Sequence, residues 1–93
     1  MNNTRNGEEM LFVTTIESGE GKFEDTIRAL KRLKIPEGIE VREFLGLFGE
    51  PDAILIFETS DEMHAVDFVC MIAQSVKCKT SLALPIDEFR WTK

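Results

Sequence analysis

One stretch decides the fold: residues 39–58, with the sequence IEVREFLGLFGEPDAILIFE. Its pattern predicts a strand, a tight turn over residues 49–52, and a second, very apolar strand. Gly49 tolerates a positive φ, Pro51 presets φ for the first central position of a turn, and Asp52 can accept hydrogen bonds from nearby backbone amides. The stretch therefore predicts a β-hairpin, on which the rest of the chain packs.

Alternation along the first hairpin strand predicts which of its side chains share a face of the sheet. Gly46, inside an otherwise regular strand, indicates a β-bulge or a close backbone contact. The partner strand, residues 53–57, is apolar on both sides. The two predicted faces of the first strand are Ile39, Val41, Leu45 and Leu47 on one side and Glu40, Arg42, Phe44 and Phe48 on the other.

Another strand is predicted before the hairpin, at residues 10–16, which are rich in β-branched and aromatic side chains. Leu11 and Val13 point to one side of this strand, and Phe12 and Ile16 point to the other. Both faces of the strand are therefore expected to be buried, as in the centre of a sheet.

The first helix is predicted over residues 22–34, ended by Pro36 and Gly38. Glu24 and Arg28 lie four residues apart on its polar face and predict an ion pair. Helical spacing gives this segment an apolar stripe of Phe23, Ile27, Leu30 and Leu33.

The second helix is predicted to open at residues 59–62, where Thr59 and Glu62 have the spacing of a capping box. His64 falls on the polar side of this helix, so we expect an exposed surface histidine. The apolar arc on the other side consists of Ala65, Val66, Phe68, Val69, Ile72 and Ala73.

A final strand is predicted at residues 76–84, and its alternation is typical of a sheet edge. Lys77 and Lys79 on such a strand discourage uncontrolled pairing with other chains. The tail that follows carries Phe89 and Trp91, two aromatic side chains that need a partner surface.

The bulk properties indicate one domain of ordinary globular composition. The chain has 93 residues and a net charge of −6, which predicts a single domain over residues 10–93 behind a polar, disordered tail at residues 1–9. The negative charge repels phosphate backbones, so nucleic acid is not expected as a direct partner. Without an apolar run of roughly 20 residues or a secretory signal, the chain is expected to be cytoplasmic rather than membrane-bound.

The cysteines and the single histidine do not predict a metal site. Cys70, Cys78 and His64 are too few ligands for a structural zinc site within one chain. Free cysteine is among the most buried residue types, so the two thiols are interpreted as buried and reduced. A regulatory disulfide is the alternative.

The element order predicts an α+β fold of the ferredoxin-like βαββαβ type, with strands in the order 4-1-3-2. Two helices cover only one face of this antiparallel sheet, although its first and third strands are apolar on both sides. Leaving several large apolar side chains in water exceeds what soluble monomers usually tolerate. We therefore expect the open face to pack on a second copy, giving a homodimer or a higher homo-oligomer. The alternative is that the C-terminal segment with Phe89 and Trp91 folds back over this face.

Residues 47–56, LFGEPDAILI, with the acid-opened helix and the strand carrying Thr80 that follow, resemble the G-x-Y-D segment of GYD-type domains. They are also similar to the effector-binding domain of Lrp/AsnC transcriptional regulators. The resemblance implies ferredoxin-like chains that pair sheet to sheet into a dimeric α+β barrel. Pro51 stands where the family usually has an aromatic residue. Only nine residues precede the first strand, so we expect the sensing half without the helix-turn-helix domain.

The first functional hypothesis is a non-catalytic, self-associating module that binds a small metabolite between subunits, with no cofactor and no catalytic residue. The resemblance implies ligand contacts at Gly49, Glu50 and Asp52, with Thr80 as a further polar contact. Turn chemistry and strand propensity explain the same four residues without a ligand.

The second hypothesis is a small enzyme of the dimeric α+β barrel type, such as a cofactor-poor monooxygenase or an isomerase. This hypothesis rests on fold analogy alone. Such chemistry usually needs a histidine, acid or aromatic group inside a cleft, and the chain has no tyrosine and one histidine, His64, expected outside. The binding module is therefore ranked above the enzyme.

Overall fold

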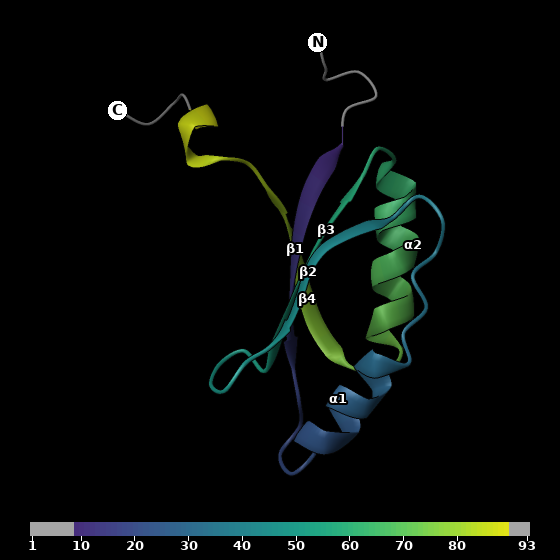
Figure 1. The fold of residues 1–93 in the computed structure, drawn as a ribbon, viewed down its shortest axis with the longest axis vertical. Helices are drawn as coiled ribbons and strands as arrows, with labels where there is room; N and C mark the ends of the chain where they lie inside the picture. The colour runs from purple at the N-terminus through teal and green to yellow at the C-terminus, as the bar shows by residue number, and fades with distance from the viewer. Residues whose placement is uncertain (1–8, 90–93) are drawn as a thin grey trace.

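The fold was analysed in a computed structural model that describes residues 9–89 (Figure 1). The tail predicted for residues 1–9 lies outside this range except for Glu9, and so does Trp91. The elements are β1 Met10–Glu17, α1 Phe23–Lys31, β2 Glu40–Gly46, β3 Ala53–Thr59, α2 Glu62–Ala73, β4 Lys77–Ala83 and the short 3-10 helix η1 Ile86–Glu88. This order confirms the predicted ferredoxin-like α+β fold. None of the described helices is long and apolar enough to cross a membrane.

The four strands form one antiparallel sheet in the order β2-β3-β1-β4, which confirms the predicted order. Both α-helices lie on the same side of this sheet, and within residues 9–89 no α-helix lies on the other side, toward which η1 projects (Figure 1). Burial alternates along β3: Ala53, Leu55, Phe57 and Thr59 are buried under the helices, and the residues between them are half-buried. The sheet therefore has a helix-covered face and an open face.

Aromatic side chains form the centre of the core on the helix-covered face. The Phe57 ring is 0% exposed, stacks on Phe12 with ring centroids 5.3 Å apart, and meets Phe68 of α2 edge-on at 5.0 Å. Ile16 and Leu55 are also fully buried beside them. Phe12 and Ile16 thus lie under the helices, while Leu11 and Val13 are the apolar β1 side chains left on the open face.

Strand β2 contains a bulge that the sequence pattern misplaced. Val41 pairs with Phe57, but Glu43 rather than Arg42 pairs with Ile56, so Arg42 is the extra residue and Gly46 is not. A bulge reverses the alternation of the residues beyond it. The predicted faces of β2 are therefore wrong after Val41, because Phe44 lies with Val41 on the helix-covered face and Leu45 lies on the open face.

The helix ends also differ from the prediction. Helix α1 ends at Lys31, and Arg28 pairs with Asp25, three residues away at 3.3 Å, instead of Glu24. The N-cap of α2 is Asp61, whose side chain accepts a hydrogen bond from the Met63 amide at 2.8 Å.

The predicted cap Thr59 is instead a buried residue of β3, one reason why α2 starts later than the capping-box pattern indicated. The predicted arc of α2 is also narrower than expected. Ala65, Phe68 and Ile72 are buried, but Val66 remains 50% exposed.

Candidate functional site

The connection between β2 and β3 is a six-residue loop, residues 47–52, rather than a tight four-residue turn. The Leu47 amide donates to the Asp52 carbonyl at 2.8 Å, which closes the loop. The Asp52 amide donates to the Ile16 carbonyl at 2.9 Å, and the Asp52 Oδ2 accepts from the Ser18 amide at 2.7 Å. The carboxylate of Asp52 thus fastens the loop to the end of β1, which is a structural role.

Three residues at the tip of the loop face solvent. Gly49 and Glu50 are exposed, and Phe48 is fully exposed although it is a large apolar side chain. In Figure 1 the loop projects from the lower end of the sheet toward the open-face side. Glu50 and Gly49 are therefore accessible to a ligand or a partner, whereas Asp52 is engaged within the subunit.

Thr80 lies apart from this loop. Its hydroxyl is 2.7 Å from the hydroxyl of the fully buried Thr14, and the two residues are partners in the β1–β4 register. Because β1 separates β4 from the hairpin, the structure does not place Thr80 beside Gly49, Glu50 and Asp52. Thr80 instead lines a groove of about 230 Å³ against α2, on the helix-covered face.

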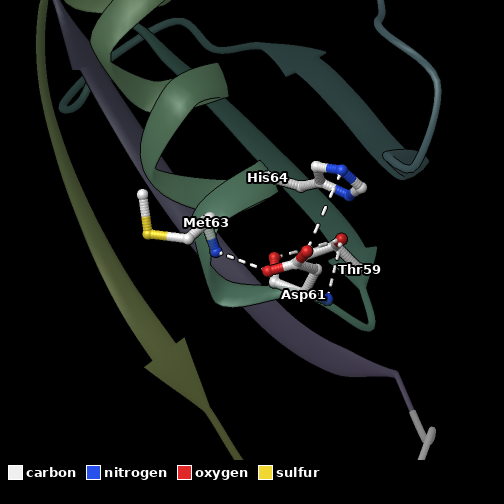
Figure 2. A network of polar contacts seen from close by, with 4 residues as sticks. All are labelled: Thr59, Asp61, Met63 and His64. Carbon is white, nitrogen blue, oxygen red and sulfur yellow. Dashed lines mark hydrogen bonds and ion pairs between the residues drawn. The ribbon is translucent and has the colours of Figure 1, made fainter.

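His64 sits at the surface near the start of α2, as predicted (Figure 2). Its Nε2 is 4.0 Å from Asp61 Oδ2, and its side chain is 49% exposed. The ring packs against Gly38, where a Cβ would lie 2.5 Å from the His64 Nδ1. His64 does not line the groove beside Thr80. His64 is therefore an exposed residue beside the N-cap of α2.

The open face has an apolar centre, formed where β1 and β3 run side by side. Val13 and Ile56 are direct partners in the register, and both are half-buried. The side chains of this centre are Leu11, Val13, Leu45, Ile54, Ile56 and Ala83.

Charge changes sign from one edge of the open face to the other. Glu40 and Glu43 of β2, with Glu58 of β3, make one edge acidic, whereas Lys79 of β4 and Lys77, which is 3.7 Å from Glu17 of β1, make the other edge basic. These two edges flank the apolar centre on opposite sides.

Three carboxylates at the acidic edge, from Glu9, Glu40 and Glu58, lie within 4.8 Å of one another. The Arg42 guanidinium enters this cluster, 2.7 Å from Glu58 and 3.5 Å from Glu40. The pKa of Arg42 is raised above its usual value. The largest cause is the hydrogen bond to Glu58, and the next is the negative charge of Glu40. Ion pairing with Arg42 explains why these carboxylates lie close together. Arg42 is the extra residue of the bulge in β2.

A second groove was not foreseen from the sequence; we name it the α1–β2 groove. It has a volume of about 410 Å³ and is lined by apolar residues of α1, the α1–β2 connection and β2, together with Lys31. Gly46 and Ala53 face each other across β2 and β3 at its floor. These two small residues at neighbouring strand positions are the sequence signal for this hollow. The sequence alone did not show which face of the sheet they share, because it did not locate the bulge at Arg42.

The two cysteines differ in environment, and the predicted burial of both is wrong for Cys70. Cys70 is exposed on α2, whereas Cys78 is half-buried against the core, and burial raises the pKa of the Cys78 thiol. Cys70 lies outside the apolar arc predicted for α2, and the arc that is buried in the structure is narrower still.

Alkylation should therefore separate the two thiols. The thiolate is the reactive species, so at pH 7.5 iodoacetamide should modify Cys70 several-fold faster than Cys78, and the Cys78 rate should rise as the pH approaches its raised pKa. Mass spectrometry of time points would follow both sites, with Cys70→Ser and Cys78→Ser as single-thiol controls. Equal rates in the two single-thiol variants would contradict the assigned environments.

Comparison with known proteins finds likeness at the level of structure. No family model and no curated protein matches this chain. Among solved structures, MtbAldR has a TM-score of 0.58 at 16% identity, over 82% of this chain and 52% of that one. PH0061 has a TM-score of 0.58 at 14% identity, over 87% and 55%. The hypothetical protein PHS023 from Pyrococcus horikoshii has a TM-score of 0.55 at 18% identity, over 89% and 98%.

The chain spans about half the length of MtbAldR and PH0061. At these identities the likeness concerns the arrangement of strands and helices rather than particular side chains. The comparisons therefore show that the chain has the α+β fold of these small domains.

Proposed function

We propose that the chain is a non-catalytic, self-associating module that binds a small molecule between subunits, as the resemblance to Lrp/AsnC effector-binding domains implies. The observation that carries the proposal is the open face of the sheet. Its apolar centre, with Val13 and Ile56 in the middle, is not covered by any helix of the described part of the chain (Figure 1). Burying such side chains is worth about 1.5–3 kcal/mol each, which a partner surface would supply.

A second copy is the partner that fits this face best. A two-fold axis along the strand direction would bring the acidic edge of one sheet against the basic edge of the other. Glu43 and Lys79 of the second copy would then come nearest, because their levels differ by one open-face step along the strands, whereas Glu40 and Lys77 lie near opposite strand ends. Charges of this kind set the register of an interface, while the apolar centre supplies most of its affinity.

Two exposed apolar side chains beside the open face also favour self-association. Phe48 is fully exposed in the β2–β3 loop, and Ile86 of η1 is 81% exposed. Both segments project toward the open-face side of the sheet, one beyond each end of the strands (Figure 1). A sheet packed on this face would lie between them and could cover both side chains.

Ligand binding is proposed at the β2–β3 loop, next to the interface. Gly49 and Glu50 are exposed there, and Asp52 holds the loop in place. Thr80 is not part of this proposed site, because it faces α2 on the helix-covered side of the sheet. The enzyme alternative lacks comparable support, since its best candidate, His64, lies at the surface.

Native mass spectrometry of gently purified protein tests both parts of the proposal. We expect a dimer or a higher oligomer at low micromolar concentration, carrying a small non-covalent adduct. The Glu50→Ala variant should lose adduct occupancy without a change in Tm, because Glu50 is exposed. Asp52→Ala is the contrasting variant: it should lower stability by about 1–2 kcal/mol, because the Ser18 amide loses a charged acceptor.

A monomer at high micromolar concentration would reject self-association. Unchanged adduct occupancy in Glu50→Ala would reject the loop as the ligand site.

A further inference from the structure

The α1–β2 groove has the features of a ligand site within a single subunit. We propose that it binds an aliphatic monocarboxylate, with the hydrocarbon chain in the groove and the carboxylate at Lys31. This goes beyond the proposed function, because the groove lies on the helix-covered face, on the other side of the sheet from the open face.

The groove exists because side chains are missing from its floor. Gly46 and Ala53 are direct partners in the β2–β3 register. These two adjacent floor positions together have a single side-chain carbon, the Cβ of Ala53. Helix α1 ends at Lys31, and the chain continues past the groove as a wall that includes Leu33 and Ile35. The floor and walls therefore enclose a hollow rather than a packed helix–sheet contact.

Its size and lining suit a small apolar molecule. The volume of about 410 Å³ falls within the range of about 300–1,000 Å³ that is common for ligand pockets. Ile27 and Leu30 of α1 and Val41 and Phe44 of β2 line opposite walls. Such walls offer dispersion contacts to an alkyl chain and no hydrogen bonds from side chains.

Lys31 gives the groove a preference for an anion. It is the only charged residue that lines this groove, and it forms no ion pair with any residue of the described range 9–89. Its neighbour Arg28 is paired with Asp25, and both cations lie in the last turn of α1. In a chain of net charge −6, an unpaired cation at the rim of an apolar groove is complementary to a carboxylate.

The test compares ligands that share a chain and differ in head group: octanoate, 1-octanol and octylammonium. Calorimetric titration of the wild-type chain should show octanoate binding about two- to fivefold more tightly than 1-octanol, as expected for an exposed ion pair. Octylammonium should bind most weakly. Hexanoate should bind about fifteenfold more weakly than octanoate, because each buried methylene contributes about a fourfold factor.

Gly46 offers a way to fill the groove without unfolding the protein. A Cβ at this position would lie 3.9 Å from Cδ1 of Ile27, an ordinary contact, and Gly46 is not among the glycines with a positive φ. Gly46→Val should weaken octanoate binding by about tenfold or more and leave Tm unchanged or higher. Gly46→Ala should have an intermediate effect on binding.

Lys31→Gln should remove the difference between octanoate and 1-octanol while leaving binding of the alcohol unchanged. Lys22→Gln is the matched control, because Lys22 lies at the other end of α1 and does not line the α1–β2 groove. Loss of the head-group difference in Lys22→Gln would assign it to net charge and overturn the role of Lys31.

Several results would overturn the proposal: no saturable binding of octanoate at millimolar concentration, equal affinity for the three head groups, or wild-type affinity in Gly46→Val. A changed subunit stoichiometry in Gly46→Val would instead assign the groove to a second copy.

The Ile56→Lys variant separates this proposal from self-association, because Ile56 lies on the open face. A monomeric Ile56→Lys chain should bind octanoate like the wild type.

Discussion

Replacing Phe57 with alanine should lower the free energy of unfolding by about 3–5 kcal/mol, the usual cost of removing a buried phenylalanine ring. Phe57 is 0% exposed and joins the sheet to α2 through its contacts with Phe12 and Phe68. Domains of this size have about 5–15 kcal/mol of stability in total, so much of it would be lost. Thermal unfolding followed by circular dichroism should show Tm falling by more than about 12 °C.

Phe48→Ala is the matched control, because it removes the same ring from a fully exposed position. Its effect on the unfolding of a single subunit should stay below about 0.5 kcal/mol. Self-association contributes to apparent stability by mass action, so both variants and the wild type must be compared at one protein concentration. Equal losses in the two variants would contradict the core described here.

Replacing Ile56 with lysine should convert the proposed oligomer to monomers. Ile56 lies at the apolar centre of the open face, opposite Val13. In a symmetric dimer the change occurs twice, and each copy loses about 1.5–3 kcal/mol of burial before any cost of burying an ammonium group. Since 1.4 kcal/mol is a factor of ten, the dimer Kd should rise at least about a hundredfold. Light scattering after size exclusion would measure this shift.

The isolated subunit should tolerate the lysine, because a long side chain on an open sheet face can extend its charge into water. Circular dichroism of Ile56→Lys should therefore remain that of a folded chain. Val66→Lys is the control, on the exposed side of α2, where the substitution should leave the stoichiometry unchanged. Dissociation by Val66→Lys but not by Ile56→Lys would place the interface on the helices.

The order of elements and strands was predictable, because it depends on periodicities that several residues report together. The apolar stretch of β3 and the two-sided apolar pattern of β1 identified the central strands. The prediction could not decide which face of β1 the helices cover. That choice depends on packing, and Phe12 and Ile16 are the pair that lies under them.

Features set by a single residue were predicted less well. The bulge at Arg42 leaves no trace in hydrophobicity, and its stabilising partner Glu58 lies on the next strand. Thr59 and Asp61 could both cap α2, and the choice depends on where β3 ends. The α1–β2 groove depends on the bulge, so it could not be derived from alternation.

The candidate site was predictable only in part. The loop around Gly49 and Glu50 was located correctly along the chain, since turn-forming residues mark it. The structural role of Asp52 depends on Ser18, 34 residues earlier, and cannot be inferred from the turn itself. Thr80 was grouped with the loop by resemblance, and β1 separates the two.

The extra residue in β2 also determines how this strand must be aligned with those of homologues. Before Arg42 the odd-numbered position Val41 faces the helices, and after it the even-numbered positions Phe44 and Gly46 do so. An alignment without a gap would match each inward position beyond Arg42 to an outward position of a strand that lacks the bulge. Sequence profiles for this strand should therefore be built as two segments that meet at Arg42.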